Sequence, residues 1–111
     1  MVIHKGLSEG RWFTFSLMEQ LGNVGSDIER AIAWKNKGET KDSEMALQRG
    51  IELLNFTIAD PKNKKRRKEL SRIKEALLDY FHGYNQYGYT DAAWQHYFYC
   101  YGYASALQKG R

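Results

Sequence analysis

Apolar residues recur every three or four positions along three long stretches of this chain, which is the period of an amphipathic helix. The pattern predicts one helix over residues 16–37, a second from residue 42 or 43 to 59, and a third over 61–82. Asp60-Pro61 separates the last two and is a recognised signal for starting a helix. Because so few residues connect these two helices, we expect them to form an antiparallel hairpin.

The first predicted helix carries two features that bear on how it packs. Ser16 and Glu19 have the spacing of a capping box, in which each side chain accepts a hydrogen bond from the backbone of the other. Gly22 and Gly25 lie inside the helix, where a glycine costs up to ~1 kcal/mol relative to alanine. Small residues at these positions let another helix approach closely.

The C-terminal quarter of the chain is unusually rich in tyrosine. All eight tyrosines lie between Tyr80 and Tyr103, and two patterns compete there. Tyrosine at every second position from 97 to 103 is typical of a strand, whereas the flanking segments TDAAWQ and ASALQK are typical of a helix. No other segment offers a good strand partner. We therefore favour a fourth helix over residues 90–108, capped by Thr90.

Together these elements predict an all-α protein, an antiparallel four-helix bundle that forms a single domain over residues 1–111. Residues 1–13 are expected to form an extended or partly ordered N-terminal arm. Three aromatic residues at its end, Trp12, Phe13 and Phe15, are expected to hold the arm against the bundle.

The composition narrows the setting in which the protein works. Hydrophobic residues make up 42% and charged residues 27%, which is typical of a soluble globular protein. Cys100 is the only cysteine, so no disulfide forms within one chain, and a reducing, cytoplasmic setting is expected. The sequence shows neither a signal peptide nor the run of ~20 apolar residues needed to cross a bilayer, and we expect no membrane association.

The net charge of +4 is concentrated in one segment. Residues 61–74 contain eight basic residues and one acidic residue, which leaves the rest of the chain at −3. Basic side chains in the first turns of a helix oppose its dipole, which favours selection for phosphate contacts with RNA or DNA. A solvated helix end is the alternative interpretation. The candidate nucleic-acid contacts are Lys62, Lys64, Lys65, Arg66, Arg67 and Lys68.

The tyrosine-rich helix also has two interpretations. Its rings could stack on the bases of single-stranded nucleic acid, or they could form part of the core and a self-association surface. We favour the second, because tyrosines distributed around a whole helix do not make one exposed platform. The face of Trp94, Phe98 and Tyr101 suits the interior of the bundle. Tyr99 and Tyr103 have no obvious cover there and are the candidates for a homodimer contact.

Two pairs of residues could in principle support chemistry. Asp79 and His82 lie one helical turn apart, as in half of a di-metal motif, but no second pair accompanies them. His96 and Cys100 are four residues apart, without a third group to orient the histidine. We therefore expect no catalytic residues, no metal site and no cofactor.

Four segments resemble a group of small bacterial helical-bundle proteins of unknown function. They are LGNVGSDIERAIAWKNKG (21–38), ELLNFTIADPKN (52–63), RIKEALLDYF (72–81) and WQHYFY (94–99). The resemblance extends over most of the chain from Leu21 onward. It implies a helical bundle and brings no catalytic motif with it.

The layout also resembles HEPN-type four-helix bundles. Ribonucleases of that class carry an arginine followed by a polar residue, and then a histidine, with four to six residues between the arginine and the histidine. No arginine stands five to seven residues before His82 or His96, so an assignment as a ribonuclease fails by that route. A likeness of fold alone is an analogy and does not establish function.

The sequence favours a non-enzymatic, cytoplasmic binding or interaction protein of unknown ligand that forms a homodimer. The alternative is a nucleic-acid-binding module that uses the basic residues 62–68, as the partner of a toxin-like or nucleotidyltransferase-like protein. An enzyme is the third hypothesis.

Overall fold

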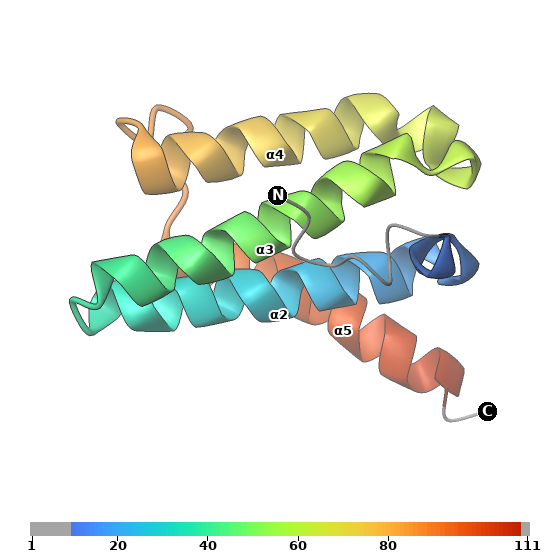
Figure 1. The fold of residues 1–111 in the computed structure, drawn as a ribbon, viewed down its shortest axis with the longest axis horizontal. Helices are drawn as coiled ribbons and strands as arrows, with labels where there is room; N and C mark the ends of the chain where they lie inside the picture. Colours follow the sequence, from blue (N-terminus) through green and yellow to red (C-terminus); the bar gives the residue numbers. More distant parts are fainter. Residues whose placement is uncertain (1–9, 110–111) are drawn as a thin grey trace.

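The computed structural model of the protein describes residues 10–109, and every regular element among them is helical (Figure 1). Four α-helices pack together, which confirms the predicted all-α four-helix bundle. The elements are η1 (Arg11–Thr14), α2 (Leu17–Asn36), α3 (Thr40–Ala59), η2 (Pro61–Arg66), α4 (Arg67–His82) and α5 (Asp91–Lys109). The two η elements are short 3₁₀ helices.

The helices α2 and α3 form the centre of the bundle (Figure 1). The helix α5 packs against α2, α4 lies beside α3, and consecutive helices run in opposite directions. Their inner faces enclose one continuous apolar core, to which all four α-helices and η1 contribute. None of the helices in the described part of the chain is both long enough and apolar enough to cross a membrane.

The local signals at the helix ends act as the sequence predicts. Ser16 and Glu19 form a reciprocal capping box at the start of α2, with hydrogen bonds of 3.1 and 3.2 Å. The hydroxyl of Thr90 accepts a hydrogen bond of 3.1 Å from the backbone N–H of Ala93. After α2 ends, Gly38 adopts a φ of 77°, a conformation that only glycine reaches without strain.

The third predicted helix is divided in two. The chain first forms η2, where the backbone N–H of Asn63 bonds to the carbonyl of Asp60 at 3.0 Å, and α4 begins only at Arg67. The cause is the side chain of Asn63, which is buried and donates to the backbone carbonyl of Thr57 at 2.9 Å. This tertiary bond holds the first turn in a tighter conformation than the sequence pattern predicts.

The end of the expected N-terminal arm is ordered where the structure describes it. Residues 1–9 of the expected arm lie outside the described residues, but Arg11–Thr14 forms a 3₁₀ helix rather than an extended segment. Trp12 is buried, and its indole N–H donates to the Thr57 hydroxyl at 3.1 Å. Phe15 packs edge-on against Trp12, with ring centroids 5.6 Å apart. Two of the three aromatic residues therefore hold this end to the bundle, while Phe13 remains exposed.

Glycines bring α5 unusually close to α2. A Cβ atom added to Gly25 would lie 2.5 Å from the Cβ of Phe98, so no larger residue fits without displacing that ring. A Cβ atom on Gly22 would lie 3.4 Å from the Cα of Gly102. The close helix approach expected from Gly22 and Gly25 is thus present, and α5 is the helix that makes it.

Candidate interaction site

The inner face of α5 is an aromatic cluster. Trp94 and Phe98 are buried, with ring centroids 6.1 Å apart, and Tyr89 stacks on Trp94 at 4.5 Å. The hydroxyl of Tyr97 is also buried, and this burial strongly raises its pKa. These contacts place much of the tyrosine-rich segment in the core, as the sequence predicts.

The opposite face of α5 carries aromatic residues into solvent. Tyr99 is 68% exposed and Tyr103 is 56% exposed, and their rings stack with centroids 6.2 Å apart. Leu107 continues the same face one turn later. The two tyrosines that the sequence identifies for self-association are therefore uncovered within a single chain.

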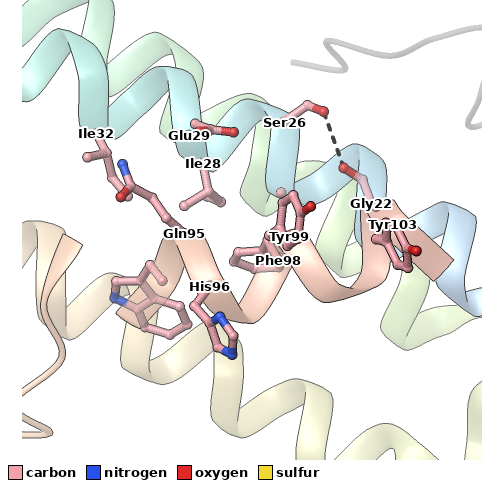
Figure 2. Close-up of a pocket in the computed structure, with 13 residues that line it drawn as sticks. Gly22, Ser26, Ile28, Glu29, Ile32, Gln95, His96, Phe98, Tyr99 and Tyr103 are labelled. Atoms are coloured by element: carbon pink, nitrogen blue, oxygen red, sulfur yellow. Dashed lines mark hydrogen bonds between the residues drawn. The ribbon is translucent and has the colours of Figure 1, made fainter. Parts of the chain in front are cut away.

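A groove runs beside these tyrosines, between α2 and α5 (Figure 2). Its volume is about 610 Å³, within the range of ligand-binding clefts. Gly25, Ile28 and Phe98, all buried, are among the residues that line it. The α2 side is lined by Gly22, Ser26, Glu29 and Ile32, and the α5 side by Trp94, Gln95, His96, Tyr99, Gly102 and Tyr103.

The charge at the start of α5 is neutralised by α2. The carboxylate of Asp91 lies 3.2 Å from the Lys35 ammonium and accepts a hydrogen bond of 3.0 Å from Asn36. From residue 92 to 108 the sequence has no aspartate, glutamate, lysine or arginine. The exposed face of α5 is therefore uncharged and aromatic, which is the composition that marks the centres of protein interfaces.

The histidines take part in separate local contacts. The sulfur of Cys100 lies 3.9 Å from Nε2 of His96, and both side chains are exposed. His82 instead pairs with Glu44 of α3 at 2.7 Å. The carboxylate of Asp79 accepts backbone hydrogen bonds from Gln86 and Tyr87, at 3.0 and 3.2 Å.

Asp79 thus holds the loop that follows α4, and His82 contacts α3. Among residues 10–109, no three histidine, cysteine, aspartate or glutamate side chains come together in a way that could hold a metal ion.

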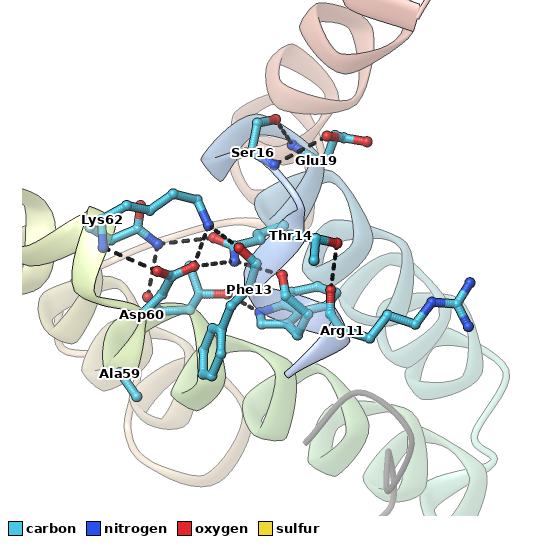
Figure 3. A network of polar contacts seen from close by, with 12 residues as sticks. Arg11, Phe13, Thr14, Ser16, Glu19, Ala59, Asp60 and Lys62 are labelled. Atoms are coloured by element: carbon cyan, nitrogen blue, oxygen red, sulfur yellow. Dashed lines mark hydrogen bonds and ion pairs between the residues drawn. The ribbon is translucent and has the colours of Figure 1, made fainter. Parts of the chain in front are cut away.

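Three of the six candidate nucleic-acid contacts make side-chain hydrogen bonds or ion pairs within the protein. Lys62 forms an ion pair with Asp60 and donates to the Phe13 carbonyl at 3.0 Å (Figure 3). Arg66 makes two hydrogen bonds of 3.0 Å to Glu69. These arrangements hold the Lys62 and Arg66 side chains against the protein, where they are less available to a phosphate.

Arg67 corrects the expectation that the basic run opposes a helix dipole. Its guanidinium donates to the carbonyls of Ile58 and Ala59, at 2.8 and 3.3 Å. These are the last carbonyls of α3, where the negative end of the dipole favours a cation. The sequence places the basic run at the start of a helix. In the structure Arg67 also lies against the C-terminal end of α3, and the interaction with that end accounts for a basic residue at this position.

Arg67→Gln is expected to lower the free energy of unfolding by about 1 kcal/mol, because charged hydrogen bonds to the α3 carbonyls are lost. Lys65→Gln is the matched control, since the Lys65 side chain is exposed and makes no hydrogen bond or ion pair within the described residues. Urea unfolding followed by circular dichroism measures both. Equal stability of the two variants would contradict a capping role for Arg67.

The comparisons with known proteins give no relative. No protein-family model, no curated protein and no solved structure matches this chain.

Proposed function

We propose that this protein is a non-enzymatic binding protein that acts through the exposed face of α5, and that it self-associates there. The observation that carries the proposal is the pair Tyr99 and Tyr103. Both rings stand mostly in water on a helix face without formal charge, beside an open groove. Large aromatic surfaces of this kind are characteristic of interaction sites.

The chemistry of the groove supports binding rather than catalysis. Its buried apolar residues provide a surface for apolar and aromatic contacts. Its polar side chains either bond within their own helix or have no second catalytic group beside them. Ser26 donates to the Gly22 carbonyl of its own helix at 3.3 Å (Figure 2). His96 lies 3.9 Å from the Cys100 thiol, but among the described residues no carboxylate is hydrogen-bonded to His96 to orient its ring. This arrangement differs from a nucleophile, base and orienting group held in sequence.

Sedimentation equilibrium over a wide concentration range tests the proposal. We expect the wild type to populate a dimer of the 13.0 kDa chain. We also expect Tyr99→Lys and Tyr103→Lys each to raise the dissociation constant at least tenfold, because each places a charge in a desolvated contact. Tyr84→Lys is the matched control, since Tyr84 is 93% exposed but lies on the loop before α5. A wild type that stays monomeric at the highest soluble concentration would refute self-association.

A second candidate function rests on the remaining basic residues. Lys64, Lys65 and Lys68 are exposed, and their side chains make no hydrogen bond or ion pair in the part of the chain that the structure describes. They lie close together in sequence on η2 and the first turn of α4, as a small phosphate-binding surface requires. Three phosphate contacts would give a log–log salt dependence of affinity of roughly −2 to −3.

Fluorescence anisotropy with a single-stranded oligonucleotide at low salt tests this second function. The triple variant Lys64→Gln, Lys65→Gln and Lys68→Gln is expected to lose binding while keeping the stability of the wild type. The absence of binding by the wild type would reject the nucleic-acid function and would leave the proposed role of α5 unchanged.

A further inference from the structure

The exposed tyrosines and the groove lie side by side on one face of the protein. Tyr99 and Tyr103 project from α5, and the groove next to them is bordered on α2 by Gly22 and Ser26, which have little or no side chain (Figure 2). A symmetric dimer needs a self-complementary surface, in which a projection of one copy meets a recess of the other. This face carries both parts.

The charges of the two parts suit such a contact. Among the described residues that line the groove, Glu29 is the only aspartate, glutamate, lysine or arginine. The exposed face of α5 carries no residue of these four types. No lysine or arginine is among the described residues that line the groove. Two copies can therefore meet face to face here without bringing their basic residues into the contact.

The available area sets the expected strength. Residues 92–107 extend α5 over about 24 Å, and α5 with the adjoining groove is about 20 Å wide. The footprint is therefore roughly 500 Å² per copy and roughly 1,000 Å² in total, which is near the lower limit for a specific interface. We expect a dissociation constant in the micromolar range, and the measurements should span concentrations on both sides of it.

We infer that two copies of this chain pack about a two-fold axis, with Tyr99 and Tyr103 of each copy seated in the α2–α5 groove of the other, over Gly22 and Ser26. The inference rests on the proposed self-association and adds the surface that receives the tyrosines. In this arrangement each phenol ring covers the small residues of α2, and its hydroxyl reaches the wet rim of the contact.

Filling the groove from the α2 side tests the inference without changing α5. Ser26→Trp is expected to raise the dissociation constant at least tenfold, because an indole would occupy the space that the tyrosines of the other copy enter. Ser26 is exposed, so the helix content and the unfolding midpoint should stay near those of the wild type. Ser71→Trp on α4 is the matched control and should leave the dissociation constant unchanged, since Ser71 is exposed but does not line the groove.

The single native cysteine allows a direct test of which residues meet. Cys100 directly follows Tyr99 on α5 and is exposed at the edge of the groove without lining it, so a short cross-linker should reach from it to residue 26 of the other copy. An isotope-labelled chain that carries Ser26→Cys and Cys100→Ala is mixed with the unlabelled wild type and treated with a short bismaleimide. Each chain then has one cysteine, so mass spectrometry identifies any adduct between residues 26 and 100 as a link between copies.

The outcomes separate the inference from the proposed function. Adducts between residues 26 and 100, together with weakened association of Ser26→Trp, would support the inference. Adducts that join only Cys100 to Cys100, with an unchanged dissociation constant for Ser26→Trp, would show that the copies meet along α5 outside the groove. That result would overturn the inference and leave self-association standing. A monomeric wild type would overturn both.

Discussion

Asp60→Ala is expected to lower the free energy of unfolding by about 3 kcal/mol, and the unfolding midpoint by more than about 10 °C. The carboxylate of Asp60 is buried and accepts hydrogen bonds from the Gln20 amide at 2.8 Å and from the Lys62 backbone at 3.1 Å. It also pairs with the Lys62 ammonium (Figure 3). Removing it leaves buried donors without an acceptor, which costs more than the net gain of the bonds themselves.

The effect extends beyond one residue because Asp60 belongs to a network that joins four elements. Gln20 of α2 also donates to the Trp12 carbonyl of η1 at 3.1 Å, and its own carbonyl accepts from Asn63 of η2 at 2.9 Å. Asn63 in turn bonds to Thr57 of α3. Loss of the carboxylate should therefore loosen η1 and η2 together. Asp42→Asn, at an exposed position in the first turn of α3, is the control, with an expected loss below about 1 kcal/mol.

The same carboxylate predicts how this stability depends on pH. Burial raises the pKa of Asp60, but hydrogen bonds from the Lys62 side chain, the Gln20 amide and the Lys62 backbone together hold it below the ordinary value of 3.8. A lowered folded-state pKa contributes stability above the unfolded-state pKa, and the contribution is lost as pH falls through the folded-state value. The difference in stability between wild type and Asp60→Asn should therefore be constant from pH 5 to 7 and should shrink below about pH 4. Urea unfolding at each pH measures it, and a difference that grew in acid would contradict this assignment.

The helices could be predicted from the sequence because their signals are local. The apolar period, the capping box of Ser16 and Glu19, and the Thr90 cap each depend on residues within one or two turns. The division of the third helix could not be predicted, since it depends on a bond between Asn63 and the end of α3. The burial of Gln20 could be predicted in part, because this residue falls on the apolar stripe of α2, four residues before Val24. Its partner Asp60 could not, because Asp60 lies 40 residues further along the chain.

The candidate site was predictable to a similar extent. A helix of uncharged, aromatic residues must leave some of them uncovered, and the period correctly singles out Tyr99 and Tyr103 as exposed. The groove depends on how closely two helices approach, and the sequence only indicated that Gly22 and Gly25 permit a close approach. The basic run was predicted as a single surface because sequence shows charge and not its partners. Arg67 finds the α3 carbonyls only once the chain has turned back on itself.

Gly25→Ala is expected to destabilise the protein by about 2 kcal/mol and to displace α5 from α2. The added methyl group would lie 2.5 Å from the Cβ and 2.9 Å from the Cγ of Phe98, whose ring is buried beside Trp94. Overpacking of this kind costs up to about 3 kcal/mol, and alanine recovers about 1 kcal/mol through its higher helix propensity. Packing therefore outweighs propensity at this position.

Gly102→Ala is the matched control, because it makes the same substitution in α5 where, among the described residues and apart from the backbone of its own helix and its chain neighbours, no atom lies within 4 Å of the added methyl group. Propensity acts alone there, so we expect this variant to gain about 0.5–1 kcal/mol. Thermal unfolding at a concentration where the wild type is monomeric compares the two without interference from association. If Gly25→Ala were also stabilising, α5 would not depend on the close approach at Phe98. The α2–α5 groove depends on this close approach, so we also expect Gly25→Ala to weaken self-association. If the variant were destabilised but associated as strongly as the wild type, self-association would not depend on how closely α5 packs against α2.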